Sequence, residues 1–290
     1  MHSKTNDSIL NINDVRRRFD RAAHGFDTVD FVHSAARDGL LARLEPMTID
    51  AHTVVDLGSA TGSGSRLLAR RFRRARIVAV DLSRNMLEAT RRKRSRFSRR
   101  LSVQANAQEL PFADQSIDVI FANLLLPWVS DPVLLFAEVS RVLREGGLFL
   151  FSTLGPDSLS EIRDAWARVD AREHVNRFFD MHDIGDAAVR AGLRDPVLDV
   201  DRLSVTYNDA ETLFRDLTSM GARNCLQNRG RSLGGVGRFR AMKAALDGQR
   251  KGDLLTLDLE LVYGHCWGSG PQSADGEYRI NAERIGHRRD

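Results

Sequence analysis

The stretch from Val54 to Gly64 constrains the fold more than any other part of the chain. An apolar run ends at Asp56-Leu57, a loop of small residues follows, and Ser65 to Arg71 continues with helical spacing. This order predicts a strand, a tight turn and a helix, which together begin a βαβ unit. Small residues let the backbone approach a ligand closely, and the start of the helix offers unpaired N–H groups. We therefore expect a flat, polar ligand at this loop.

The spacing of the loop argues against two common nucleotide-binding motifs. A P-loop ends in Lys-Ser or Lys-Thr, whereas this loop runs into Gly64-Ser65-Arg66. A dinucleotide fingerprint needs Gly-x-Gly-x-x-Gly after the strand, and Gly58, Gly62 and Gly64 do not fit that register. Phosphate binding is not expected, and a plain strand-to-helix turn without a ligand stays open at this point.

The loop resembles the first motif of class I S-adenosylmethionine-dependent methyltransferases, commonly Asp-Leu-Gly-x-Gly-x-Gly. The middle glycine of that motif is Ala60 here, so a methyl group occupies the position of close approach. The resemblance implies that S-adenosyl-L-methionine is the cofactor and that Asp56, Gly58, Ala60 and Gly62 contact it.

A second strand, Arg76 to Asp81, also ends in a carboxylate. An acidic residue roughly 20 residues after a glycine loop is placed to accept hydrogen bonds from both ribose hydroxyls of an adenosine. Asp81 fits this spacing, and Ser83 is a credible N-cap for the helix that follows. Two strands with acidic ends favour a nucleoside-type cofactor more strongly than a single such strand does. Leu82 is a further predicted contact of this cofactor.

Two asparagines continue the series. Asn106 stands where the methyltransferase pattern often has an acidic residue that accepts from the adenine amino group, and an Asn oxygen can accept the same bond. Ala107 is its predicted neighbour at the cofactor. Asn123 ends the fourth strand, beside the transferred methyl. The alternation of strands and helices predicts a doubly wound, mostly parallel seven-stranded sheet with ligands at the carboxyl ends of its strands.

The remaining segments suggest a layout around this sheet. We expect residues 1–46 to form a helical lid of two helices, near 12–30 and 32–44, over one edge of the crevice. The methyltransferase domain spans 47–267, with helical insertions near 155–180 and 209–250, and 268–290 forms a disordered tail. Asp157 or Ser158 is expected to cap the first inserted helix, 196–207 to form a strand or hairpin, and Gly234 to Gly237 to form a turn.

The net charge of +4 conceals an uneven distribution, since residues 1–100 hold 21 of the 43 Lys and Arg but only 11 of the 39 Asp and Glu. The basic runs Arg66 to Arg76 and Arg91 to Arg100 fall at the amino ends of strands, far from the expected crevice. We interpret them as solvated faces, or as a surface that attracts an acidic partner. Few aromatic residues interleave them, which makes nucleic acid an unlikely partner.

Other features bound the class of protein. The two cysteines, Cys225 and Cys266, fit neither a disulfide framework nor a zinc site, so we expect no metal and a reducing compartment. No apolar run approaches the roughly 20 residues of a membrane helix, and the polar start has no signal-peptide core. We expect a cytoplasmic protein that does not enter the membrane.

Five segments carry a more specific resemblance, and they are Arg18 to Ala23, Asn123 to Trp128, Thr153 to Leu159, Phe179 to Asp186, and Val262 to Trp267. They resemble one family, the malonyl-[acyl-carrier protein] O-methyltransferases of biotin synthesis. Two departures stand out: Ser59-Ala60 in the loop, and Pro127 where the family often has Gln before Trp128. The five similar segments, from Arg18 to Trp267, are spread along nearly the whole chain except the tail.

The resemblance implies that the methyl acceptor is the free carboxylate of malonyl-acyl carrier protein. Such a carboxyl has a pKa of about 4, so it is ionised at neutral pH and no general base is needed. Trp128, Leu125 and Leu126 are expected to form a dry wall. A cation should hold the other carboxylate oxygen, and the candidates on the covering segments are Arg163, His174, Arg177 and His182.

Two alternatives remain open. A related group of mitochondrial assembly factors, which hydroxylate an arginine of respiratory complex I, shares several of these segments. A non-catalytic binding protein that has kept the fold but lost the cofactor is the other, suggested by Ala60 and Asn106.

Overall fold

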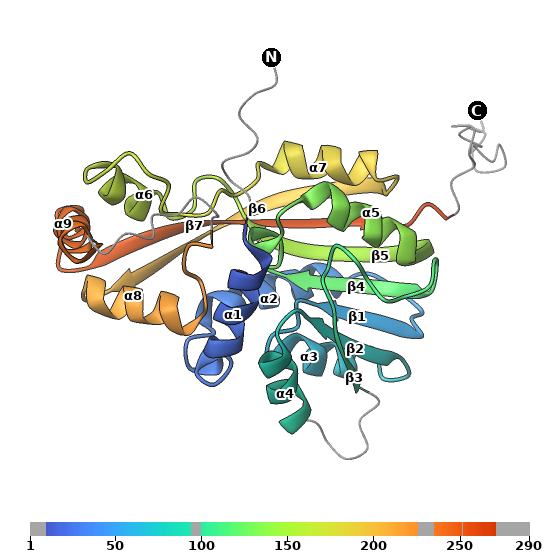
Figure 1. Cartoon of the computed structure of the whole chain (residues 1–290). Coiled ribbons are helices and arrows are strands. Elements are labelled where there is room, and N and C mark those ends of the chain that lie inside the picture. Colours follow the sequence, from blue (N-terminus) through green and yellow to red (C-terminus); the bar gives the residue numbers. More distant parts are fainter. Residues whose placement is uncertain (1–9, 94–99, 226–234, 251, 271–290) are drawn as a thin grey trace, which may run out of the picture.

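The computed structural model describes residues 10–93, 100–225, 235–250 and 252–270. Its centre is a seven-stranded sheet in the order β3-β2-β1-β4-β5-β7-β6 (Figure 1). The first five strands in that order are parallel, and β7 is antiparallel to both of its neighbours. The strands are β1 (Thr53–Leu57), β2 (Arg76–Asp81), β3 (Arg100–Gln104), β4 (Ile117–Asn123), β5 (Leu143–Leu154), β6 (Arg194–Tyr207) and β7 (Leu255–Trp267). The predicted doubly wound, mostly parallel sheet is confirmed.

Side chains alternate between the two faces along each strand, and helices cover both faces of the central strands. Val54 and Phe121 face a cluster with α2 (Phe31–Leu44) and α3 (Ser63–Arg71). Val55 and Ile120 face a cluster with α5 (Pro132–Val142) and α7 (Met181–Arg190). Helix α4 (Arg84–Arg92) packs on β2 and β3, and Ser83 is its N-cap as predicted, its Oγ accepting a hydrogen bond from the N–H of Met86 at 3.2 Å.

The two N-terminal helices lie in different places. Helix α1 (Ile12–Ala22) packs against α4, at the carboxyl ends of the parallel strands, and a short 3-10 turn, η1 (Phe26–Thr28), follows it. Helix α2 instead buries Leu40 and Leu44 against the sheet, so only its first turns reach the crevice. Of the two helices, α1 and the start of α2 lie where the lid was expected, while the lid itself and the domain boundary at residue 46 stay predictions.

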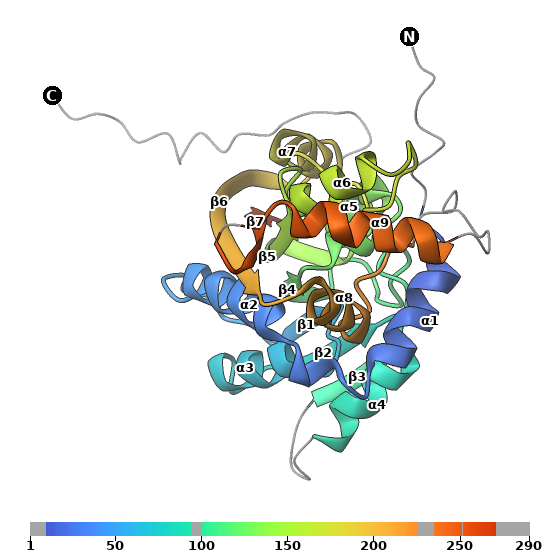
Figure 2. The ribbon, with the colours of Figure 1, turned by 90° about the vertical axis from the view of Figure 1, so that its left-hand side faces the viewer.

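The last two strands are long, and they extend past the parallel strands (Figure 1). Around their far ends lie α6 (Ser160–Ala167), α8 (Ala210–Ser219) and α9 (Gly235–Asp247), which fall within the two predicted insertions. These helices and the strand ends share a separate apolar cluster that includes Ile162, Leu213 and Leu257. Figure 2 faces this end of the molecule, with α9 above α8 and α1 beside them.

Some local predictions were wrong and one was confirmed. The N-cap of α6 is Leu159, in a left-handed conformation without a side-chain cap, because Ser158 Oγ is used by β7, where it accepts from the N–H of Glu260 at 3.0 Å. Residues 194–207 form one strand, which confirms the first of the two predicted alternatives, a strand or a hairpin. Gly235 and Gly237 lie in α9 rather than in a turn, whereas Gly234 and the tail 271–290 fall outside the described residues.

None of the helices within the described ranges is both long and apolar enough to cross a membrane.

Candidate active site

The glycine loop joins β1 to α3 through three residues with positive φ: Gly58 at 73°, Ala60 at 45° and Gly62 at 81°. Two hydrogen bonds fix its start, because the N–H groups of Gly58 and Ser59 both donate to the carbonyl of Val80. Ala60 thus adopts the left-handed backbone usually reserved for glycine, so its methyl group does not prevent the loop conformation.

A cavity lies at the carboxyl ends of β1, β2 and β4. Gly58 and six others of the residues predicted to bind the cofactor line it, and α1 adds Val15 and Phe19. Gly62 does not line this cavity; it packs beneath the loop, where an added Cβ would lie 2.6 Å from Thr90 Cγ2. The six are Ala60, Asp81, Leu82, Asn106, Ala107 and Asn123.

Asp81 is the charged group of this cavity. Its carboxylate accepts hydrogen bonds from the N–H of Ala60 at 2.8 Å and from the N–H of Ser83 at 2.8 Å. Burial raises the pKa of Asp81 to about 6 despite these bonds. The nearby carboxylates of Asp56 and Asp20 raise the pKa further. A ligand that donates hydrogen bonds here, or carries positive charge, would favour the ionised form.

Asn106 and Asn123 also carry local bonds. Asn106 Oδ1 accepts from the N–H of Gln108 at 3.1 Å, which leaves one of the two lone pairs of this oxygen. Asn123 Nδ2 donates to the carbonyl of His33 at 3.0 Å and thereby ties the end of β4 to the start of α2.

A small polar pocket adjoins the cavity beneath the loop, and it contains Asp56. Asp56 Oδ2 accepts from Ser65 Oγ at 2.5 Å, and burial raises the pKa of Asp56 to about 6. Helix α2 contributes Asp30, at its N-cap, and Arg37, whose Nη2 lies 3.1 Å from Asp30 Oδ2. Within the described chain, Asp30 Oδ1 and Arg37 Nε are buried without a hydrogen-bond partner.

The sequence reasoning missed Asp30, His33 and Arg37. Their spacing of three and four residues places them on one face of a helix, which was the available signal. His33 is the most central of the three, because it lines the cofactor cavity, the polar pocket and the large cavity described next. Burial lowers the pKa of His33 to about 4, and its Nδ1 is buried with no partner among the described residues.

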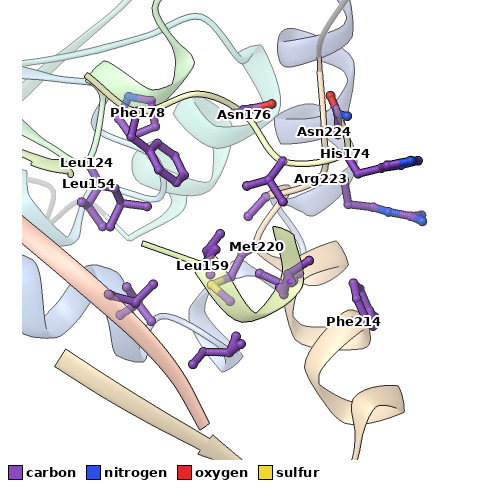
Figure 3. Close-up of a pocket in the computed structure, with 18 of the residues that line it drawn as sticks. Leu124, Leu154, Leu159, His174, Asn176, Phe178, Phe214, Met220, Arg223 and Asn224 are labelled. Carbon is purple, nitrogen blue, oxygen red and sulfur yellow. The ribbon is translucent and has the colours of Figure 1, made fainter. Parts of the chain in front are cut away.

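A large cavity, about 450 Å³, lies between α6, α8, α9 and the ends of β6 and β7 (Figure 3). Most of its lining is apolar, including Leu154, Leu159, Phe178 and Met220. It meets the cofactor cavity at a shared wall of His33, Leu124 and Trp128, and Trp128 packs edge-on against Phe19. We call it the acceptor cavity.

The predicted dry wall is only partly in place. Trp128 lines both cavities and Leu125 lines the cofactor cavity. Leu126 lines neither, because its side chain is fully buried in the core cluster beneath the sheet.

Of the four predicted cations, only His174 lines the acceptor cavity, where it stacks on Trp166 with ring centroids 3.6 Å apart. Its Nε2 lies 2.7 Å from Asp170 Oδ1. Arg163 and Arg177 line a further pocket on the outside. The structure does not bring His182 to any of these cavities; it is exposed beside Asp180, the N-cap of α7.

The basic run from Arg66 to Arg76 lies along α3 and the start of β2. Arg71, for example, donates to the carbonyl of Met47 at the amino end of the sheet. This position is away from the cavities, as predicted, whereas residues 94–99 of the second run lie outside the described residues.

Comparisons with known proteins agree with this fold and with the position of the glycine loop in it. A family model described as "Methyltransferase domain" matches residues 55–151. Among solved structures, the YcgJ protein of Bacillus subtilis superposes with a TM-score of 0.57 at 16% identity, covering 80% of this chain and 98% of that one. Phosphoethanolamine N-methyltransferase 2 of Haemonchus contortus, solved with S-adenosyl-L-methionine, gives 0.53 at 18% identity, covering 86% and 57%. Fold and site together define a class I, S-adenosylmethionine-dependent methyltransferase.

Curated relatives narrow this class. The malonyl-[acyl-carrier protein] O-methyltransferase of Laribacter hongkongensis is 41% identical over 261 residues, 87% of this chain and 88% of its own. The protein of the same name from Halorhodospira halophila is 40% identical over 281 residues, 95% of each chain. The chain belongs to the malonyl-[acyl-carrier protein] O-methyltransferase family.

Proposed function

We propose that the protein transfers a methyl group from S-adenosyl-L-methionine to the free carboxylate of malonyl-acyl carrier protein. The observation that carries this proposal is the shared wall of His33, Leu124 and Trp128 between a cavity with a ribose acceptor and an apolar cavity. A donor in one cavity and an acceptor in the other would meet at this wall. Positioning of this kind supplies much of the rate of a bimolecular transfer.

The residues of the cofactor cavity fit the proposed donor. We assign Asp81 to the ribose hydroxyls and Asn106 to the adenine, and this assignment is supported by the position of both in the cavity. The polar pocket offers Asp30 and Asp56 to an α-ammonium group, and it offers Arg37 to an α-carboxylate. The unpartnered Asp30 Oδ1 and Arg37 Nε support this assignment, because buried polar atoms without partners are costly and rare.

When bound, S-adenosylmethionine would supply a methyl group on a positively charged sulfur. The ionised carboxylate oxygen would bond to the methyl carbon as the carbon–sulfur bond breaks, S-adenosylhomocysteine would be the leaving group, and no proton would need to be removed. The chain's own residues therefore position and desolvate rather than remove protons. Trp128 and Leu124 keep water from the shared wall, which favours a transfer in which opposite charges cancel.

His33 is the proposed partner of the acceptor carboxylate. As a neutral imidazole it carries one N–H donor, and its ring lies at the shared wall rather than at the outer end of the cavity. A hydrogen bond to the oxygen that does not react would leave the other oxygen directed at the methyl group. His174 is a second candidate at the same cavity, although Asp170 already engages its Nε2.

The test is transfer of a labelled methyl group. Incubation with labelled S-adenosylmethionine and malonyl-acyl carrier protein is expected to give a base-labile methyl ester on the carrier protein. Absence of label on the carrier protein, with a folded and cofactor-binding enzyme, overturns the proposal.

Two measurements address the alternatives, consumption of the methyl donor and binding of S-adenosylhomocysteine. A hydroxylase of a protein arginine would turn over without consuming the methyl donor. A non-catalytic protein would fail to bind S-adenosylhomocysteine in calorimetry. The left-handed backbone of Ala60 supports cofactor binding, because the loop keeps the shape that glycine gives it in the motif.

We also infer a cytoplasmic location, and this inference is supported by the buried thiols of Cys225 and Cys266.

A further inference from the structure

An outer pocket of about 410 Å³ lies beside the acceptor cavity. The two cavities share Trp166, His174 and Phe178, so both lie against the segment that leads from α6 to α7. The acceptor cavity therefore meets the cofactor cavity at Leu124 and has His174, from this segment, at its other end. Figure 3 shows the side chains of His174 and Arg223 pointing away from the apolar lining at this second end.

Two arginines flank this end, and they come from segments far apart in the sequence. Arg172 lines the outer pocket and Arg223 lines the acceptor cavity. Their segments lie side by side, because Asn224 Nδ2 donates to the carbonyl of Glu173 at 3.0 Å. A second bond joins the N–H of Cys225 to Asn176 Oδ1 at 3.3 Å. We call Arg172 and Arg223 the rim arginines.

The rim arginines carry charge that their surroundings do not balance. Both are exposed, and neither has an ion-pair partner among the residues that the structure describes. The acidic side chains nearby are already engaged: Glu173 by Arg177, and Asp170 by His174 and Arg238. Guanidinium groups bind phosphate through paired hydrogen bonds, so an unbalanced pair of them favours a phosphate.

We propose that the rim arginines bind the phosphate of the 4′-phosphopantetheine arm that carries the malonyl group. The inference rests on the proposed function, which places the malonyl carboxylate at His33. The uncharged part of the arm then passes along the apolar lining of the acceptor cavity, and its phosphate emerges at the rim. This assignment gives Arg172, on the segment from α6 to α7, a role at the far end of the arm rather than at the reacting carboxylate.

Direct binding measures this site without turnover. Calorimetry with 4′-phosphopantetheine and with pantetheine is expected to show tighter binding of the phosphorylated compound to the wild type. In the double variant Arg172→Gln/Arg223→Gln this preference is expected to fall by about fivefold to tenfold, the size of two exposed ion pairs. The control Arg168→Gln removes an exposed arginine near the same segment that lines neither cavity, and its preference should match the wild type.

Turnover gives a second readout that separates the possible anionic sources. The double variant is expected to raise the KM for malonyl-phosphopantetheine, malonyl-coenzyme A and malonyl-carrier protein together, with kcat and the KM for malonyl-pantetheine unchanged. An effect confined to the carrier protein would show that the rim contacts the protein surface, and it would overturn the phosphate assignment. Equal binding of pantetheine and 4′-phosphopantetheine to the wild type would also overturn it. Lack of methylation of every acceptor would instead overturn the proposed function.

Discussion

Asp81 Oδ2 accepts a hydrogen bond from the backbone N–H of Ala60 at 2.8 Å, so the tip of β2 holds the middle of the glycine loop that follows β1. The same carboxylate also accepts from the N–H of Ser83 at the start of α4. One side chain therefore fixes the shape of the loop and presents the expected ribose acceptor. A change in the shape of the loop would therefore also move the ribose acceptor, and a substitution of Asp81 would also alter the loop.

The first prediction concerns Asp81. Asp81→Ala removes hydrogen bonds to a charged acceptor, each worth roughly 1.5–3 kcal/mol, so the affinity for S-adenosylhomocysteine should fall at least about tenfold. Asp81→Asn keeps an acceptor oxygen without the charge, so its affinity for S-adenosylhomocysteine should lie between those of the wild type and Asp81→Ala. Calorimetry measures the three affinities, and a loss below about twofold in the alanine variant would show that the ribose lies elsewhere.

The second prediction concerns the pH dependence of stability through Asp56. Burial raises the pKa of Asp56 to about 6 in the folded protein, above its ordinary value. The folded state thus binds this proton more tightly than the unfolded state, so the free energy of unfolding falls as pH rises from about 4 to 6 and stays low above that.

Asp56→Asn removes this penalty and keeps an oxygen to accept from Ser65. The variant should gain up to about 3 kcal/mol of unfolding free energy at pH 8 and much less near pH 4. Urea unfolding at the two pH values measures the difference. An equal change at both would contradict the role of ionisation, and the affinity for S-adenosylhomocysteine should fall at pH 8.

The third prediction concerns the close approach of the loop to α4. An alanine Cβ at Gly62 would lie 2.6 Å from Thr90 Cγ2, and Gly62 has a φ of 81°. We expect Gly62→Ala to cost at least about 2 kcal/mol of unfolding free energy from strain and overlap together. Adding Thr90→Ser removes the methyl group but keeps the hydroxyl bond to the carbonyl of Ala60, and it should recover part of that cost.

Thr90→Ser alone is the control for this series, since its own effect must be subtracted in a double-mutant cycle. If the effects of the two substitutions on the free energy of unfolding simply add, the contact between Gly62 and Thr90 is not the cause of the destabilisation. Urea unfolding of the four proteins provides the comparison.

The fourth prediction concerns His33. His33→Leu removes the proposed donor at similar size, and the KM for the malonyl thioester should rise at least about tenfold for loss of a hydrogen bond to a charged group. His33→Asn retains an N–H donor and should recover part of the loss. Val32→Ala changes a neighbouring residue of the same cavity and should have a smaller effect.

A purely structural role for His33 would give a different pattern. If His33 holds the acceptor carboxylate, the affinity for S-adenosylhomocysteine and for the methyl ester product should be unchanged in His33→Leu, because neither ligand presents that carboxylate. Parallel losses for all ligands would show that the imidazole only maintains the wall.

The cofactor half of the site could be predicted from the sequence because its signals are local. Asp56, Gly58 and Ala60 follow one another on a single strand and turn, and Asp81 ends the next strand. The alternation of strands and helices then places these residues at one edge of the sheet. The sequence could not show that Asp56 lies in a separate pocket beneath the loop.

The acceptor half could not be predicted in the same way, because its residues meet only through tertiary packing. Arg18 Nη2 donates to the carbonyl of Asn224, which is 206 residues away. In the sequence, His33 is one residue of an ordinary helix. Its spacing did not indicate that Asn123, at the end of β4, would donate a hydrogen bond to its carbonyl. Arg163 and Arg177 were assigned to the reacting carboxylate because they lie on a covering segment, but the segment turns them to its outer side.

The long antiparallel pair of β6 and β7 gives the molecule a modular character. In the proposed function, the donor lies at the carboxyl ends of the parallel strands, whereas α6, α8 and α9, around the ends of the long pair, line the acceptor cavity. Substitutions in α6, α8 and α9 can therefore alter acceptor choice while the machinery for the donor stays intact. Diversification of such enzymes can proceed at one end of a shared sheet.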